Sequence, residues 1–105
     1  MVEFLHFFIK GDSMLPTLKD GDSIKMIKFD NNININVNDI VVFEHPFKKK
    51  CKLIKRIKKI TKDNKFFVEG DNSNHESSND SHNFGYIKKN SLIAIRKEIN
   101  EVTCS

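Results

Sequence analysis

The segment DIVVFEHPFKKKCKLIKRIKKI, residues 39–60, carries the strongest secondary-structure signal in the chain. Residues 39–45 are rich in β-branched and aromatic residues and stop at Pro46, so they predict a strand. Residues 47–50 predict a turn, and residues 51–61 predict a second, long strand. Helical periodicity is almost absent elsewhere, whereas short strand patterns recur between turn residues. The sequence therefore predicts an all-β protein.

Further strands are predicted on both sides of this pair, at residues 2–9, 23–29, 65–69, 85–88 and 92–97. Residues 70–84 are rich in Gly, Asp, Asn, Ser and His and predict a loop, of a length that is usually functional or disordered in a compact domain. A short helical turn is predicted at residues 89–92. No internal repeat or linker interrupts the pattern. We therefore expect one domain over residues 1–105, built as an all-β sheet or small barrel.

The charge of the chain is moderately basic, with a formal net charge of +4. An acidic partner is one explanation, and a lysine-rich solvated surface is the other. The basic run at residues 48–62 has apolar residues at alternate positions and no interleaved aromatic residues, which favours a solvated strand face. We expect no nucleic-acid partner.

The cysteines and the N-terminus indicate the compartment. Cys51 and Cys104 form neither a disulfide framework nor a CxxC metal pair, so reduced thiols in the cytoplasm are expected. The apolar stretch at residues 4–9 is too short to span a bilayer and lacks the layout of a signal peptide. The sequence predicts a soluble cytoplasmic protein with no stable membrane insertion.

One lysine of the long strand stands on an apolar face. Because alternate residues of a strand share a face, Cys51, Leu53, Lys55 and Ile57 lie together. The alternation changes phase afterwards, so a bulge or strand end is predicted near Lys59. Lys55 either extends to the surface, as most lysines do, or is buried with a lowered pKa. A neutral amine of the second kind could accept a proton from a serine hydroxyl.

The segment GDSMLPTLKDGD, residues 11–22, is the second unusual stretch. Its Gly, Asp and Pro residues are typical of turns, which accounts for part of the pattern. Turn formation does not require Ser-Met-Leu-Pro-Thr in the middle. Ser13 is therefore either a loop hydroxyl or a nucleophile.

Three segments in this order resemble the serine–lysine peptidases of the signal peptidase I family. They are GDSMLPTL with Ser13, LIKRI with Lys55, and GDN at residues 70–72 followed by SNDSHNFG at residues 78–85. The strand at residues 39–45 also matches, and the resemblance extends over about residues 7–97. It implies a small, strongly coiled antiparallel sheet or partial barrel of the signal peptidase I catalytic-core type.

The resemblance implies a role for each matching residue. Ser13 would be the nucleophile, its backbone N–H would bind the oxyanion, and Lys55 would be the general base. Ser78 would orient the Lys55 amine through a hydrogen bond. Three further residues would hold the active-site loop together by hydrogen bonds: Asp71, Asn72 and Asp80.

The sequence departs from the family pattern at three positions. Gly11 stands where some members carry a second hydroxyl donor to the oxyanion, and Asn38 replaces a glycine. His82 replaces the arginine expected to pair with Asp80, which makes that pair weaker or pH-dependent. Arg56 is a candidate replacement partner for Asp80.

Within the family, the chain most resembles the small proteases that mature nickel-type superoxide dismutase. The similarity lies in GDSMLPTL, in IVVFEHP at residues 40–46 and in the short chain. It implies removal of an N-terminal propeptide from the dismutase precursor, whose mature N-terminus supplies metal ligands. We expect no cofactor in the protease itself, because His75 and His82 fit no standard metal-ligand spacing.

Other functions stay open on the sequence. The protein could be a signal peptidase acting on exported proteins, or the regulatory half of a self-cleaving repressor. It could also be a catalytically inactive binding module. Cys51 is a rival nucleophile on the face of Lys55, although no histidine partner is evident for it.

Overall fold

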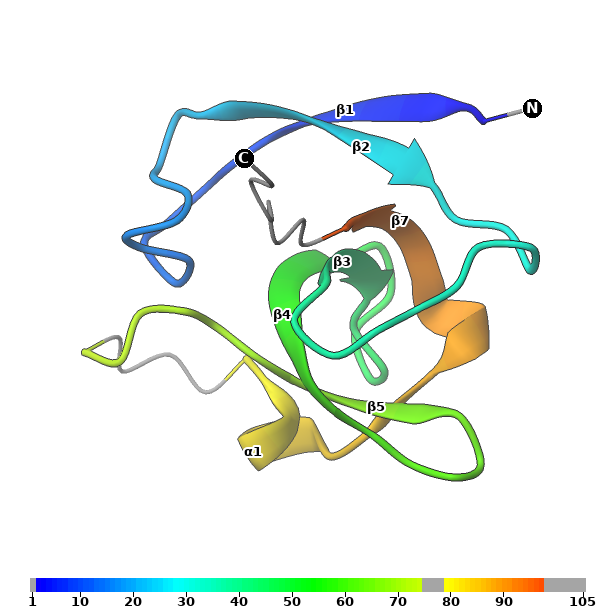
Figure 1. Cartoon of the computed structure of the whole chain (residues 1–105). Coiled ribbons are helices and arrows are strands. Elements are labelled where there is room, and N and C mark those ends of the chain that lie inside the picture. Colours follow the sequence, from blue (N-terminus) through cyan, green and yellow to red (C-terminus); the bar gives the residue numbers. More distant parts are fainter. Residues whose placement is uncertain (1, 75–78, 98–105) are drawn as a thin grey trace, which may run out of the picture.

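The computed structural model describes residues 2–74 and 79–97. In these ranges the chain forms one seven-stranded antiparallel sheet with the strand order β1-β2-β7-β3-β4-β5-β6. The sheet coils strongly (Figure 1), but its end strands β1 and β6 do not pair, so it is not a closed barrel. The predicted all-β, coiled antiparallel fold is confirmed.

The strands lie where the sequence predicted them, within a few residues at their ends. They are β1 (Phe4–Phe8), β2 (Ser23–Lys28), β3 (Ile40–Glu44), β4 (Lys52–Ile60), β5 (Lys65–Glu69), β6 (Ile87–Lys88) and β7 (Leu92–Arg96). The predicted helical turn is confirmed as the 3-10 helix η1 (Lys89–Ser91).

The loop predicted over residues 70–84 is wrong at its C-terminal end, where Ser81–Phe84 forms the short helix α1. Asp80 caps this helix, because its carboxylate accepts a hydrogen bond from the His82 N–H at 2.9 Å. Gly85 ends it with a φ of 82°. Asp and Gly at these two positions are ordinary helix-boundary residues, but one helical turn is too short to show periodicity.

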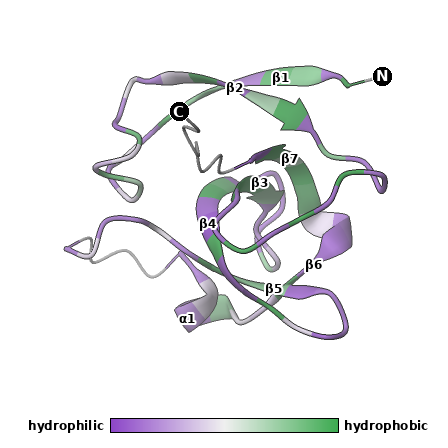
Figure 2. Cartoon of the chain, viewed as in Figure 1, coloured by the Kyte–Doolittle hydropathy of each residue, from purple (hydrophilic) through white to green (hydrophobic). Residues whose placement is uncertain are grey.

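Strand β3 is buried on both faces and separates two hydrophobic cores. Val41 and Phe43 pack into one core with β4, β5 and α1, whereas Ile40 and Val42 pack into the other with β1 and β2. Figure 2 shows β3 and β7 as hydrophobic elements at the centre of the coiled sheet. Burial on both faces explains why residues 40–43 read as a continuous apolar run.

The second core anchors the loop at residues 11–22, which connects β1 to β2. Met14 and Leu18 of this loop are buried in that core. At the base of the loop, the Ile9 N–H donates to the Asp22 carbonyl and the Gly21 N–H donates to the Ile9 carbonyl, both at 2.8 Å. The loop that carries Ser13 is therefore fixed by packing as well as by its turns.

Strand β4 follows the predicted alternation. Lys55 is only 4% exposed and lies opposite Val41 in the β3–β4 ladder. The register between β4 and β5 shifts between Ile57 and Lys59, which confirms the predicted bulge. Lys55 is therefore buried, and the alternative that it extends into solvent is wrong.

The turn before β3 explains one departure from the family pattern. Asn38 has a φ of 81°, a conformation that glycine adopts freely and that asparagine tolerates better than most residues. Its backbone is fixed on both sides: the N–H donates to the Ile57 carbonyl, and the carbonyl accepts from Arg56, both at 2.8 Å. The glycine position of the family is thus a position of positive φ in this chain.

We predict that Asn38→Ala lowers the free energy of unfolding by about 1 kcal/mol, because alanine is strained at this φ. Asn38→Gly should stay close to the wild type. Urea unfolding followed by circular dichroism measures both, since the chain has no Trp for fluorescence. Equal stability of the alanine and glycine variants would contradict the explanation.

Candidate active site

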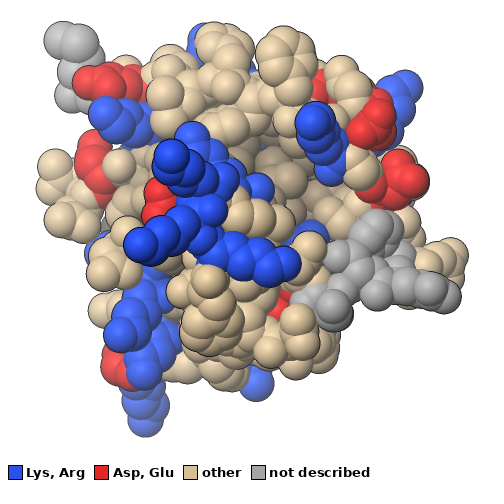
Figure 3. Space-filling model, turned by 180° about the vertical axis from the view of Figure 1, so that it is seen from behind, with Lys and Arg blue, Asp and Glu red and all other residues tan. Residues whose placement is uncertain are grey.

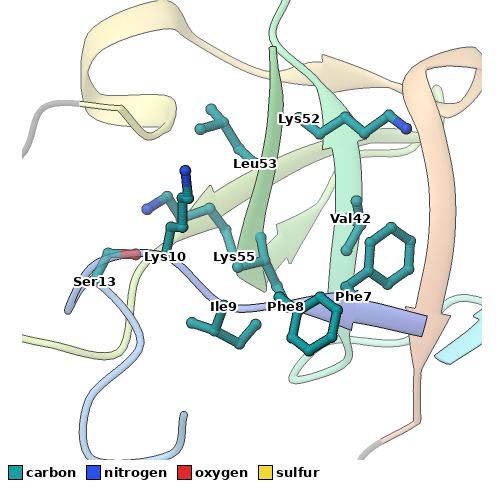
Figure 4. Close-up of a pocket in the computed structure, with 10 residues that line it drawn as sticks. Phe7, Phe8, Ile9, Lys10, Ser13, Val42, Lys52, Leu53 and Lys55 are labelled. Carbon is teal, nitrogen blue, oxygen red and sulfur yellow. The ribbon is translucent and has the colours of Figure 1, made fainter. Parts of the chain in front are cut away.

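An open groove of about 310 Å³ runs between the end of β1 and strand β4. It brings together Ser13 and Lys55, the two residues singled out in separate segments of the sequence (Figure 4). Its walls are mainly apolar. The remaining lining residues are Phe7, Phe8, Ile9, Lys10, Val42, Lys52, Leu53 and Ile54.

The electrostatics of Lys55 follow from its burial. Burial lowers the pKa of the Lys55 amine, and the negative charge of Asp80 opposes this effect without cancelling it. Within the described residues, no hydrogen bond joins Ser13 Oγ to Lys55 Nζ. The two residues thus line a common groove without a hydrogen bond between them, and catalytic hydrogen bonds commonly tighten only when substrate binds.

The backbone of Ser13 is hydrogen-bonded at its carbonyl group and, within the described residues, not at its N–H group. Its carbonyl accepts a hydrogen bond from the Asn72 N–H, and the neighbouring Asp12 carbonyl accepts one from Asn72 Nδ2, both at 2.9 Å. The Ser13 N–H has no partner in the part of the chain that the structure describes. It is the donor that the sequence analysis assigned to an oxyanion.

Gly70, the residue directly after β5, touches the same backbone. A Cβ atom at this position would lie 2.5 Å from the Ser13 carbonyl oxygen and 3.3 Å from its carbonyl carbon. These distances are too short for a side chain facing another backbone. Glycine is required here by the close approach of the two segments and not by its φ.

Asp71 links the Ser13 loop to strand β4. Its carboxylate pairs with Arg56 through two hydrogen bonds of 2.8 and 2.7 Å and accepts a third, of 2.5 Å, from Thr17 Oγ1. Burial alone would raise the pKa of Asp71. The hydrogen bonds from Arg56 and Thr17 and the nearby positive charges outweigh burial and lower it.

The ion pair between Arg56 and Asp71 contradicts one prediction from the sequence. Arg56 was a candidate partner of Asp80, but it binds Asp71 instead. The reason is strand alternation: Arg56 points to the opposite face of β4 from Lys55, whereas the charge of Asp80 acts on Lys55.

Asp80 has a different partner, His82. The distance from Asp80 Oδ1 to His82 Nδ1 is 3.2 Å, and the His82 ring packs edge-on against Phe67. Histidine in place of the family arginine thus contacts Asp80 locally, at the N-terminal cap of α1. Ser78, expected to orient Lys55, lies outside the described residues.

Several residues of the site had no role assigned from the sequence. Thr17 was visible in the Ser-Met-Leu-Pro-Thr segment, but only the fold shows that its hydroxyl reaches Asp71. Ser81 is buried, and its hydroxyl accepts a hydrogen bond from the Val68 N–H at 2.8 Å, which fixes α1 against β5. The close approach of Gly70 likewise needed the three-dimensional structure.

Three alternatives raised on the sequence were a Cys51 nucleophile, a metal site and association with a membrane. Cys51 is not among the described residues that line the groove. His75, one half of the imagined histidine pair, lies outside the described residues. In the part of the chain that the structure describes, no cluster of three or more His, Cys, Asp or Glu residues is placed to hold a metal. None of the described helices is long and apolar enough to cross a membrane.

A coiled antiparallel sheet with a groove that holds a serine and a buried lysine is the arrangement of a serine peptidase of the signal peptidase type. The family model described as "Signal peptidase, peptidase S26" matches residues 1–61. Since this match covers more than half of the chain, the protein belongs to that family. The match contains Ser13 and Lys55 and ends before Gly70. No curated protein matches the chain.

We predict that Gly70→Ala lowers peptidase activity by a factor on the order of 10², because the added methyl group displaces the Ser13 backbone. Rates of peptide hydrolysis and circular dichroism spectra should be compared with those of Ser73→Ala, an exposed position in the same loop. Full activity of folded Gly70→Ala would show that the close approach has no role in placing Ser13.

Proposed function

We propose that this protein is a serine endopeptidase with a Ser13–Lys55 dyad that removes an N-terminal propeptide, with a nickel superoxide dismutase precursor as its substrate. The proposal of this dyad rests on one observation: Lys55, a buried lysine of lowered pKa, lines the same groove as Ser13. Burial favours the neutral amine, which is the form that a general base must have.

The reaction then follows from the groove. Neutral Lys55 Nζ accepts the proton of Ser13 Oγ while the oxygen attacks the scissile carbonyl carbon. The resulting oxyanion accepts a hydrogen bond from the Ser13 N–H. Lys55 returns its proton to the leaving amine as the C–N bond breaks, which leaves an ester on Ser13. A water molecule, deprotonated by Lys55, attacks the ester carbon. The bond from this carbon to Ser13 Oγ breaks, Lys55 returns the proton to Oγ, and the acid is released.

The choice of substrate rests on the resemblance of GDSMLPTL and IVVFEHP to the proteases of nickel superoxide dismutase maturation. The metal ligands of that dismutase include its terminal amine, so nickel binding requires the cut. The proposed place of action is the cytoplasm. Membership of the signal peptidase family supports a second candidate substrate, the leader of an exported protein.

We predict that the wild type shortens a nickel superoxide dismutase precursor to its mature N-terminus and that neither Ser13→Ala nor Lys55→Ala does so. Intact-mass spectrometry measures the cut, with Ser23→Ala, an exposed serine of β2, as the matched control. An exported preprotein is incubated in parallel. Cleavage of the preprotein alone would replace the dismutase by the second candidate, and cleavage by Lys55→Ala would exclude the dyad.

We predict that activity rises with pH as Lys55 loses its proton, with a midpoint below the ordinary value of 10.5. The free energy of unfolding also rises with pH. The reason is that the unfolded chain binds more protons than the folded one between the lowered pKa of Lys55 and 10.5. The free energy of unfolding should therefore rise with pH across that window in the wild type and not in Lys55→Met.

Rates of peptide hydrolysis and urea unfolding at a series of pH values test both statements. Lys55→Arg, which keeps its proton throughout the range, should be inactive at every pH. A midpoint at or above 10.5 would contradict the role of burial.

A further inference from the structure

The groove at Ser13 is positively charged as well as apolar. Three of its lining residues are lysines, Lys10, Lys52 and Lys55, and none of the described residues that line it is acidic. Lys10 and Lys52 are exposed, whereas Lys55 is buried. Seen from behind, the surface of the molecule carries a gathering of Lys and Arg side chains (Figure 3).

The exposed lysines of the groove have no acidic partner among the described residues, a property that they share with other exposed lysines such as Lys62. Neither Lys10 nor Lys52 forms an ion pair within the described part of the chain. Glu44 stands opposite Lys52 in the β3–β4 ladder, but their charged atoms do not come within 4.0 Å. Four other basic residues are paired: Lys28 with Glu3, Arg56 with Asp71, Lys65 with Asp63 and Lys97 with Asp39.

Lys10 is the better placed of the two for contact with a substrate. It lies two residues after the end of β1, three positions before Ser13, and lines the same groove (Figure 4). The nearby carboxylates do not neutralise it: Asp20 accepts a hydrogen bond from the Gly11 N–H at 2.7 Å, and Asp12 does not line the groove. A lysine without an acidic partner among the described residues therefore lines the same groove as Ser13.

We propose that Lys10 is a specificity-determining residue that binds the carboxylate of an Asp or Glu side chain in the peptide substrate, next to the bond cut at Ser13. The apolar walls, Phe7 and Leu53 among them, take neighbouring apolar side chains of the same extended segment. Charge complementarity selects this occupant, because a basic segment would meet only like charges in the groove. The inference rests on the proposed peptidase function for the identity of its ligand.

Binding tests the inference without requiring cleavage. Fluorescein-labelled peptides of Ala, Leu and Ser, each with one Glu at a different position, are titrated with Ser13→Ala and followed by fluorescence anisotropy. Each Glu peptide has a Gln twin. At one or two adjacent positions the Glu peptide should bind about 3- to 10-fold more tightly at low salt, and the difference should shrink at high salt.

The same titrations are repeated with Lys10→Gln and Lys10→Glu introduced into Ser13→Ala. Lys10→Gln should abolish the difference, and Lys10→Glu should reverse it in favour of Lys peptides. Lys62→Gln and Lys62→Glu, at an exposed position of the β4–β5 turn, are the matched controls and should keep it. Equal affinity for the Glu peptide and its Gln twin at every position would overturn the proposal. A preference for Glu that persists in Lys10→Gln would overturn it as well.

Hydrolysis by the chain with native Ser13 separates this inference from the proposed function. Cleavage of Glu and Gln twins at equal rates would keep the peptidase and overturn the role of Lys10. Charge-selective binding without cleavage of any peptide or precursor would keep the role of Lys10 and overturn the peptidase.

Discussion

The ion pair between Arg56 and Asp71, with Thr17 as a third partner, is the interaction on which the site depends. It joins three segments that are distant in the chain: strand β4, the loop after β5 and the loop of Ser13. The two charged side chains are only 12% and 10% exposed. Loss of either partner would leave a buried charge uncompensated, a change that costs about 3–5 kcal/mol. The neighbours of the pair bear on the site: Lys55, next to Arg56, lines the groove, and Gly70 and Asn72, next to Asp71, contact the Ser13 backbone.

A second constraint is the burial of β3 on both faces. Because β3 separates two cores, the strand beside it must supply apolar residues to each of them in turn. Lys55 occupies one of these inward positions on β4, where water is largely excluded. The same alternation turns the next residue, Arg56, to the other face and toward Asp71. Neighbouring residues thus have opposite surroundings: burial lowers the pKa of Lys55, whereas Arg56 has a carboxylate partner.

Much of the fold could be predicted from the sequence, because strand alternation and turn residues are local signals. The strands, the 3-10 turn near Lys89 and the bulge before Lys59 were all accessible in this way. Helix α1 was missed because a single turn has no periodicity. The contacts of Gly70 and the partner of Arg56 were not predictable, since they depend on how distant segments approach each other. The family resemblance supplied roles for residues but not these distances, and the candidate pairing of Arg56 with Asp80 was wrong.

The hydrogen bonds that close the site join residues far apart in the chain: Thr17 and Asp71 are separated by 54 positions, and Asp12 and Asn72 by 60. Such contacts form late, because the closure of a long loop must precede them. A nascent chain that ends before Gly70 already contains both Ser13 and Lys55, yet it lacks the segment that holds the Ser13 backbone. Synthesis of this protein therefore delivers Ser13 and Lys55 well before it delivers the residues that hold the Ser13 loop.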